Sequence, residues 1–284
     1  MERVIVTHRD GFDKAKKLFA QGGLKKFHVV ADFDRTLTRA YVDGEKTPSI
    51  ISELRRGNYL GEDYMKKANE LASFYHPIEL DLKIPLHERK KAMHDWWSKH
   101  FELLLASGLN KKHITDVIND GKVRFREGVE ELLDFLHSHK IPLIIISAAG
   151  LGEEAISIFL NKHGKLYSNT HIVSNSFKWD SKGNALSINK PIIHVMNKDE
   201  TSVKDFGFYD SIKDRKNVLL LGDSLEDVDM VNGYDYEGLI KVGFLNEKVD
   251  ENLEKYKSYY DILILDDGNM DYVNGMLNEM FVDK

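Results

Sequence analysis

Two aspartates two residues apart follow a short apolar segment and are the first candidates for chemistry in this sequence. Asp32 and Asp34 come directly after residues 27–31, whose composition is typical of a buried strand. Side chains two apart point the same way along an extended chain, so we expect both carboxylates to emerge together at the strand's carboxyl end. Such a pair can hold a hard cation, or divide into a nucleophile and a proton carrier. An acidic turn that merely caps the strand is the alternative for this motif alone.

A second acidic motif, residues 222–227, follows the apolar run at 218–221. Gly222 permits a tight turn, and Asp223, Ser224 and Asp227 place carboxylates and a hydroxyl at another strand end. The alternative is a helix amino terminus that Asp223 or Ser224 caps, and the two roles are compatible.

Two further segments are suited to binding an anion. Ser147 and Ala148 follow the apolar run at 143–146 and precede Gly150, a composition that allows backbone amides to surround a phosphate. Lys198 could neutralise the same anion. Taken separately, these signals are weak: any strand-to-helix turn favours serine and glycine, and a lone lysine is usually a solvated surface residue.

The segments that carry these residues alternate with helical patterns, which predicts an α/β fold with a parallel, Rossmann-like sheet and right-handed crossovers. Near-continuous apolar runs predict strands buried on both faces, at residues 27–31, 143–146, 218–221, 239–242 and 262–265. Residues 174–188 differ and predict a β-hairpin. Residues 41–124 show mainly helical spacing, which predicts a helical lobe (41–124) inserted into a core formed by 1–40 and 125–284.

Composition restricts the class of protein. The chain has 284 residues, no cysteine and a formal net charge of −6. We therefore expect no thiol chemistry, no disulfides and no general attraction to nucleic acid or an anionic membrane. The amino terminus resembles no targeting peptide, and the longest apolar stretch, 141–150, is too short to span a bilayer. We expect a cytoplasmic protein; its oligomeric state stays open, with a monomer slightly favoured.

The order of these motifs resembles that of the haloacid dehalogenase superfamily of phosphotransferases. The resemblance implies that Asp32 is the nucleophile and Asp34 the acid/base. Ser147, with neighbouring amides such as that of Ala148, and Lys198 would bind phosphate. Mg²⁺ would be held by Asp32, Asp223 and the Asp34 backbone carbonyl, with Asp227 and Ser224 in support.

A closer resemblance, to the pyrimidine 5′-nucleotidases of the cytosolic 5′-nucleotidase III type, extends over nearly the whole chain. It rests on residues 32–39, 193–198, 220–227 and 240–246, and within the lobe on 78–81 and 96–99. It implies that Glu79 hydrogen-bonds the base, that Trp97 stacks on it and that His100 lies near it. Without the resemblance, Glu79 could equally be a surface carboxylate. Since an adjacent pair on a helix usually has one side chain in the core, we expect Trp96 inside and Trp97 toward the cleft. Two departures bear on base choice: residues 48–52 lack the His-Asn pair of animal members, and His100 stands at a serine position.

The expected activity is therefore that of a Mg²⁺-dependent 5′-nucleotidase acting on a small-molecule nucleotide, UMP or CMP, through a phosphoaspartyl intermediate. A phosphatase similar to phosphoserine phosphatase is the enzymatic alternative. A silent nucleotide-binding or metal-sensing module is the alternative from another class, although no catalytic position is missing.

Overall fold

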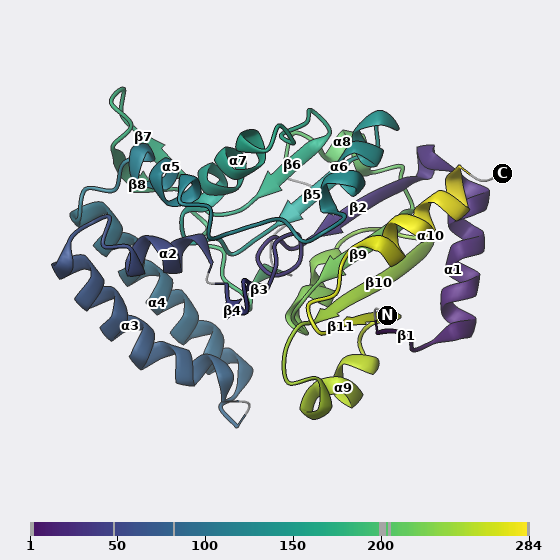
Figure 1. Ribbon diagram of the computed structural model, residues 1–284, viewed down its shortest axis with the longest axis horizontal. Helices are drawn as coiled ribbons and strands as arrows, with labels where there is room; N and C mark the ends of the chain where they lie inside the picture. Colours follow the sequence, from purple (N-terminus) through teal and green to yellow (C-terminus); the bar gives the residue numbers. More distant parts are fainter. Residues whose placement is uncertain (1–2, 48, 82, 199–202, 204–205, 283–284) are drawn as a thin grey trace.

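The computed structural model describes residues 3–47, 49–81, 83–198, 203 and 206–282. Its centre is a seven-stranded sheet in which β1 is antiparallel to its neighbour and the other described pairings are parallel (Figure 1). In spatial order the strands are β1 (Val4–Val6), β11 (Ile262–Leu265), β10 (Gly238–Leu245), β9 (Asn217–Gly222), β2 (Phe27–Ala31), β5 (Leu143–Ile146) and β6 (Thr170–Val173). The predicted α/β class is confirmed.

All five strands expected from apolar runs are present, and β2, β5 and β11 have the predicted bounds. The hairpin is present as β7 (Phe177–Trp179) and β8 (Ala185–Ile188). The two edge strands, β1 and β6, were not predicted, because each spans only three or four residues and is only partly buried.

The central strands pack apolar side chains on both faces of the sheet. In β2, Val29 and Ala31 belong to the large cluster beneath α1, α6, α7 and α10, whereas Val30 belongs to a second cluster on the other face. The helices of this part of the chain are α1 (Arg9–Gly22), α6 (Val129–Ser138), α7 (Gly152–Lys162), α8 (Tyr209–Ile212), α9 (Val249–Lys257) and α10 (Asp271–Phe281). The short 3₁₀ helices are η1 (Leu24–Lys26) and η4 (Glu226–Val231). Burial on both faces explains why the apolar runs were continuous.

Four helices lie between β2 and α6, to one side of the sheet (Figure 1). They are α2 (Ile50–Arg56), α3 (Glu62–Leu80), α4 (Leu86–Ala106) and α5 (Lys111–Asn119), preceded by the short strands β3 (Tyr41–Val42) and β4 (Glu45–Lys46). The hairpin β7–β8 joins this group, since Ala185 N donates to Leu109 O at 2.9 Å. None of the helices in the described ranges is long and apolar enough to cross a membrane. The division into core and cap at residues 40/41 and 124/125 stays a prediction.

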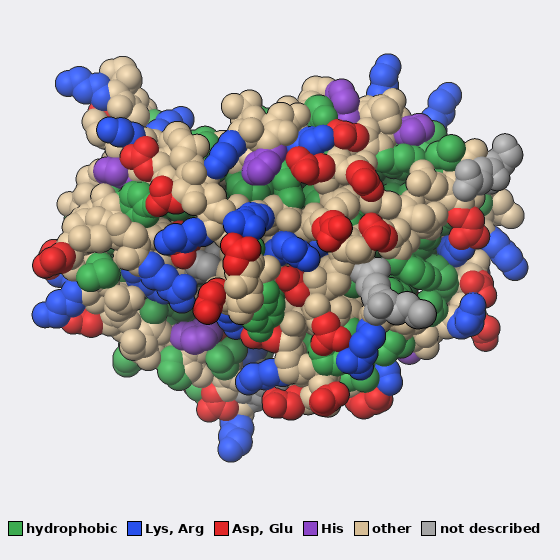
Figure 2. All heavy atoms as spheres, in the orientation of Figure 1, with side chains coloured by type: hydrophobic (Ala, Val, Ile, Leu, Met, Phe, Trp, Pro, Cys, Tyr) green, Lys and Arg blue, Asp and Glu red, His purple; other side chains and the backbone are tan. Residues whose placement is uncertain are grey.

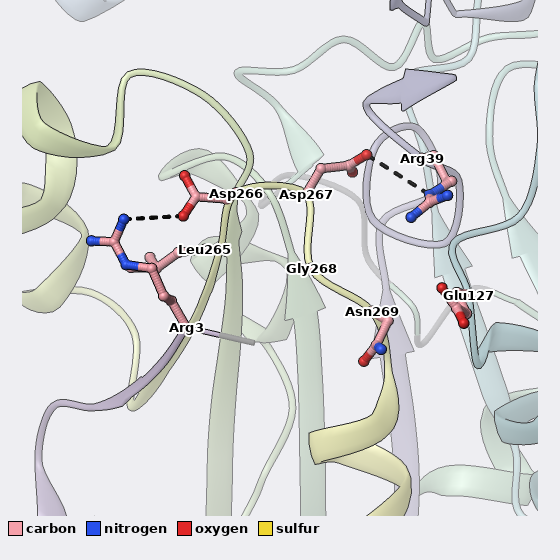
Figure 3. Close-up of a pocket in the computed structure, with 8 residues that line it drawn as sticks. All are labelled: Arg3, Arg39, Glu127, Leu265, Asp266, Asp267, Gly268 and Asn269. Carbon is pink, nitrogen blue, oxygen red and sulfur yellow. Dashed lines mark hydrogen bonds and ion pairs between the residues drawn. The ribbon is translucent and has the colours of Figure 1, made fainter. Parts of the chain in front are cut away.

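The chain leaves and re-enters the sheet region through two linkers that run side by side. Thr38 and Phe125 form an antiparallel bridge, and Arg39 N donates to Arg124 O at 3.0 Å. Asp267 also holds the first linker, because its carboxylate accepts from Ala40 N at 2.8 Å and Tyr41 N at 3.0 Å. The loop that carries Asp267 also pairs with Arg3 and Arg39 (Figure 3).

Arg126 fastens these linkers to the loop after β2, and it is almost fully buried at 1% exposure. Its Nε donates to Thr36 O at 2.8 Å and an Nη to Asn246 Oδ1 at 3.0 Å, while another Nη lies 3.1 Å from Asp267 Oδ1. Its guanidinium also lies 4.2 Å from the Phe244 ring centroid. Burial lowers the pKa of Arg126 to about 10, and Asp267 opposes that shift, so the side chain stays cationic at neutral pH.

Replacing Arg126 by alanine removes the nearest cation from Asp267 and the guanidinium donors from the Thr36, Arg35 and Gly268 carbonyls. We expect Arg126→Ala to lower the free energy of unfolding by about 3–5 kcal/mol, the usual cost of breaking a buried ion pair. Urea denaturation followed by far-UV circular dichroism measures this loss.

Arg124 provides the matched control, because its ion pair with Asp43 is exposed. Arg124→Ala should cost less than about 1 kcal/mol. An equal loss of unfolding free energy in the two variants would show that the buried contacts of Arg126 stabilise the linkers no more than an exposed ion pair does.

Candidate active site

The register of the parallel strands brings the predicted motifs to one edge of the sheet. Ala31 pairs with Leu221 of β9 and with Ile145 of β5, so these strands end side by side. Asp32 N donates to Leu221 O at 3.0 Å, which fixes the aspartate directly beyond the sheet. The carboxyl ends of strands are where open α/β sheets bind ligands.

Lys198 lies between two carboxylates at this edge. Its Nζ is 2.5 Å from Asp32 Oδ1 and 2.7 Å from Asp227 Oδ1. The side chain is only 6% exposed, so the alternative of a solvated surface lysine is excluded. Residues 32, 198 and 227, which are far apart in the sequence, thus form one buried charged cluster.

Asp227 also shapes the loop that carries Asp223. Its Oδ2 accepts from the backbone N–H groups of Asp223 and Ser224, both at 3.0 Å. A Cβ on Gly222 would lie 2.5 Å from the Asp227 Cβ, so this close approach requires glycine. The expected cap by Asp223 or Ser224 is not observed at η4; Asp227 satisfies the turn instead.

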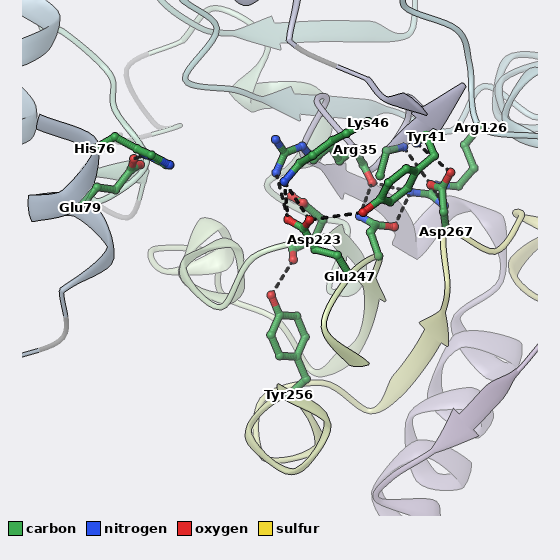
Figure 4. A network of polar contacts seen from close by, with 12 residues as sticks. Arg35, Tyr41, Lys46, His76, Glu79, Arg126, Asp223, Glu247, Tyr256 and Asp267 are labelled. Atoms are coloured by element: carbon green, nitrogen blue, oxygen red, sulfur yellow. Dashed lines mark hydrogen bonds and ion pairs between the residues drawn. The ribbon is translucent and has the colours of Figure 1, made fainter. Parts of the chain in front are cut away.

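Two tyrosines brace the same loop from outside. Tyr256 of α9 donates to Asp223 O at 2.9 Å (Figure 4), and the Tyr260 hydroxyl donates to Ser224 O. Both were missed in the sequence, where a tyrosine pair at i, i+4 is the only signal. Together with Asp227 they leave the Asp223 loop little freedom to move.

Burial dominates the electrostatics of the cluster. It raises the pKa of Asp32 to about 7, although Lys198 acts in the opposite direction. Burial also raises the pKa of Asp34, opposed by Arg35 and Lys198. The pKa of Asp223 is raised most by burial and then by the charges of Asp227 and Asp32. Burial alone would lower the pKa of Lys198, but the two carboxylates raise it, so the lysine is cationic.

The same carboxylates are suited to a divalent cation. Asp32, Asp223 and Asp227 each offer one oxygen, and these oxygens lie within 4.8 Å of one another. An all-oxygen, acidic donor set is what Mg²⁺ prefers. Since Asp227 already uses both oxygens for Lys198 and the backbone, Asp32 and Asp223 are the better candidates for direct ligands.

The loop after β5 lies between the sheet and the group of helices α2, α3, α4 and α5 (the cap). Ser147 is buried, and Ala148 and Ala149 are half-buried. Asn175, which was not predicted, ties this loop to the lysine segment: its Nδ2 donates to Ala149 O at 3.3 Å and Ile193 O at 2.9 Å. No pattern in the sequence marks this asparagine.

Trp97 lies directly against this loop. A Cβ on Gly150 would be 2.7 Å from Trp97 Cζ3, so the ring rests on the glycine backbone. Trp97 and Trp96 are both half-buried and lie nearly parallel, with ring centroids 6.1 Å apart. The expectation of one tryptophan in the core and one outside is therefore too simple, because each packs on a different apolar cluster.

Glu79 and His100 have partners within the cap. Glu79 Oε2 lies 2.9 Å from His76 Nδ1, one helical turn away on α3. His100 is buried at 4% exposure, with its Nε2 3.3 Å from the Tyr64 hydroxyl and its ring beside Trp97. Burial lowers the pKa of His100 to about 4, with a smaller contribution from Arg55, so the ring is neutral.

A polar network lies beside Asp223 (Figure 4). Glu247 accepts from Lys46 Nζ at 2.7 Å, and Arg35, the residue after Asp34, lies 3.9 Å from it. Neither Lys46 nor Glu247 was singled out in the sequence, which contains many charged residues. On the face shown in Figure 2, acidic and basic side chains are interspersed over the surface.

Comparison with known proteins now decides the family. A family model described as "Pyrimidine 5′-nucleotidase (UMPH-1)" matches residues 35–281, beginning just after Asp32 and Asp34. The chain belongs to the pyrimidine 5′-nucleotidase family. Among relatives, 7-methylguanosine phosphate-specific 5′-nucleotidase A of Xenopus laevis is 34% identical over 90% of this chain and 88% of its own length. The protein of the corresponding name from Homo sapiens is 32% identical over 92% of this chain and 86% of its own length.

Solved structures agree with this assignment. Cytosolic 5′-nucleotidase IIIB, solved bound to cytidine, superposes with a TM-score of 0.89 at 27% identity, covering 98% of this chain and 93% of its own. A substrate-bound phosphoserine phosphatase superposes with a TM-score of 0.54 at 15% identity, covering 88% and 97%, which shows the shared fold alone. The haloacid dehalogenase-like fold is thus confirmed. As a member of this family, the chain is a phosphoric monoester hydrolase of the 5′-nucleotidase type.

Asp223 destabilises the metal-free 5′-nucleotidase fold when it is ionised. A carboxyl whose folded pKa is raised above 3.8 keeps a proton that the unfolded chain has released, so stability falls as the pH rises above that value. In EDTA at pH 8 we therefore expect Asp223→Asn to raise the melting temperature, by about 2–4 °C for each kcal/mol gained. Differential scanning calorimetry measures the shift.

Asp229→Asn, at an exposed carboxylate of η4 just beyond the motif, is the control and should shift the melting temperature by less than about 1 °C. Adding Mg²⁺ should stabilise the wild type and leave Asp223→Asn nearly unchanged. A lower melting temperature for Asp223→Asn in EDTA would contradict the assignment of net repulsion to this cluster.

Proposed function

We propose that this chain is a Mg²⁺-dependent 5′-nucleotidase that hydrolyses nucleoside 5′-monophosphates through a phosphoaspartyl intermediate. The observation that carries the proposal is the buried cluster of Asp32, Lys198 and Asp227, with Asp223 beside it, at the carboxyl ends of β2 and β9. Family membership supplies the reaction class.

Asp32 is the proposed nucleophile. Its carboxylate forms a bond to phosphorus while the bond from phosphorus to the ribose 5′ oxygen breaks. Lys198, 2.5 Å from Asp32 Oδ1, keeps the carboxylate oriented and offsets charge on the transferred phosphoryl group. Ser147 and the Ala148 amide are the proposed donors to the other phosphoryl oxygens, and Ser224 supports the loop opposite them.

Asp34 is the proposed acid and base. Burial raises its pKa, which favours the protonated form needed to give a proton to the departing 5′ oxygen. The resulting Asp34 carboxylate then takes a proton from the water that attacks the phosphoaspartyl phosphorus, and this attack releases Asp32 and phosphate. One proton is thus given and one recovered in each cycle.

Asp32, Asp223 and the Asp34 backbone carbonyl would hold Mg²⁺, and their acidic oxygen donors fit that ion. The bound ion supplies positive charge that lowers the repulsion between a phosphate dianion and this acidic site. Asp227 holds Lys198 and the turn at residues 223–224 in place.

Trp97 is the proposed platform for the base, and a pyrimidine the proposed base, as in UMP or CMP. The ring rests on Gly150, in the same loop as Ser147, and this placement supports one shared nucleotide site. Glu79 is the proposed acceptor for a base N–H, after release from His76, and the neutral His100 a further polar contact. Residues 48–52 lack the His-Asn pair of animal members, and this difference bears on which base is preferred. Pro48 lies outside the described residues.

A second candidate substrate is 7-methylguanosine 5′-monophosphate. Several relatives are named as specific for it. A 7-methylated guanine carries a positive charge, and a cation is attracted to the face of an indole ring such as that of Trp97. A carboxylate such as Glu79 would complement the same charge.

We further propose that the protein acts in the cytoplasm, as the names of some relatives indicate, and that residues 41–124 form the cap that selects the substrate. A nucleotide is the proposed partner, with no nucleic acid or membrane. A monomer is the proposed state.

Phosphate release tests the reaction. The wild type should hydrolyse UMP, CMP or 7-methyl-GMP with Mg²⁺ and lose activity in EDTA, while phosphoserine should be a poor substrate. Asp32→Asn should lose more than about 1,000-fold in kcat, as expected when a nucleophile is removed. Asp250→Asn, at an exposed position in the first turn of α9, is the control. Brisk turnover of phosphoserine without turnover of any nucleotide would refute the substrate class.

Trp97→Ala tests the base platform. Loss of stacking should raise KM for the preferred nucleotide by about 10-fold or more, consistent with about 1–3 kcal/mol per stacked base, with a smaller effect on kcat. Turnover of p-nitrophenyl phosphate, which has no base, should change less than about threefold, and Trp97→Phe should recover part of the affinity. Trp179→Ala is the tryptophan control. An unchanged KM in Trp97→Ala would remove Trp97 from the base site.

A further inference from the structure

The segment that carries Lys198 is anchored at one end by the core. Asn175 is buried at 1% exposure and makes two hydrogen bonds to Ile193: its Nδ2 donates to the carbonyl and its Oδ1 accepts from the N–H, both at 2.9 Å. Ile193 itself packs in the cluster on one face of the sheet. This end of the segment is therefore fixed to the core.

The next four residues form a tight turn. His194 N donates to Asn197 Oδ1 at 2.7 Å, and Asn197 N donates to His194 O at 3.1 Å. Asn197 Nδ2 also donates to Ile192 O at 2.9 Å. These bonds fix the backbone from 192 to 197, so Met196 cannot move far without moving Lys198, two residues later.

Met196 is held by the cap rather than by the core. It is buried at 4% exposure in a cluster with Tyr75 of α3 and Met93 of α4. Trp96 packs on this cluster and lies nearly parallel to Tyr75, at 10° and 5.9 Å between ring centroids. Trp96 in turn stacks on Trp97. The turn thus touches the aromatic group that ends at the proposed base platform.

We propose that Met196 is a positioning residue that couples helices α3 and α4 to Lys198. When α3 and α4 pack against Met196, they hold the turn in place. The turn then holds the Lys198 ammonium group 2.5 Å from Asp32 Oδ1. When the helices move away from the sheet, the turn loses its outer support and the lysine loses its alignment. The inference deepens the proposed function, since it rests on Lys198 acting in phosphoryl transfer.

Met196→Ala tests the coupling because it removes the contact with the cap without changing the lysine itself. We expect kcat to fall about 10-fold or more, since small displacements of catalytic groups cost up to about 100-fold in rate. KM should change less than threefold, because the base contacts stay. Met196→Leu, which keeps the apolar volume, should restore kcat to within about twofold.

Met276→Ala is the matched control. Met276 of α10 is also buried at 4% exposure but packs in the large core cluster. It should lower the melting temperature about as much as Met196→Ala and leave kcat within about twofold of the wild type. If both variants lower kcat equally, the effect of Met196→Ala is general destabilisation and the proposal is wrong.

A double-mutant cycle with Met93→Ala separates coupling from two independent losses. If Met93 and Met196 act through one contact, the double variant should lose no more kcat than Met196→Ala alone, within about twofold. Multiplicative losses, or an unchanged kcat in Met196→Ala, would overturn the proposal.

Each measurement is made with UMP, 7-methyl-GMP and p-nitrophenyl phosphate. If the wild type cleaves only p-nitrophenyl phosphate, the proposed nucleotidase function fails while the coupling is still tested on that substrate. If nucleotides are cleaved and Met196→Ala matches the wild type, only the coupling fails.

Discussion

A buried ammonium group has to be neutralised by the protein around it, and the placement of Lys198 between Asp32 and Asp227 is the constraint on which the site depends. Removing one partner of such a group would leave an uncompensated charge in a medium that solvates it poorly. Asp227 meets this requirement with one oxygen and closes the Asp223 turn with the other. The same carboxylate therefore fixes both the lysine and the loop that presents Asp223.

The sheet and the cap contribute different things to this arrangement. The sheet sets distances along its edge, because parallel strands in register end together and deliver Asp32, Ser147 and Asp223 to one place. The cap covers that edge, where the Trp97 ring rests on Gly150. The loop at residues 147–150 therefore carries the proposed phosphate donors and also contacts the proposed base platform.

Much of the core could be predicted from the sequence, because strands buried on both faces need continuous apolar runs and aspartates after such runs are conspicuous. The edge strands β1 and β6 could not, since an apolar or mixed run of three or four residues is too short to distinguish from a loop. Arg126 and Asn175 were also beyond reach: each acts through hydrogen bonds to backbone carbonyls, which leave no trace in residue spacing. The orientation of Trp96 and Trp97 depends on packing across the cap and the core, which helical periodicity does not encode.

The bridge between Thr38 and Phe125 has a consequence for how such a chain can diversify. Since the polypeptide departs and returns at adjacent points, the intervening stretch closes on itself and imposes no length requirement on the sheet. Insertions or replacements there leave the strand register untouched, and loop-closure entropy grows only slowly with added residues. A lineage can therefore exchange the part of the chain that is proposed to select the substrate while keeping Asp32, Lys198 and Asp223 in place.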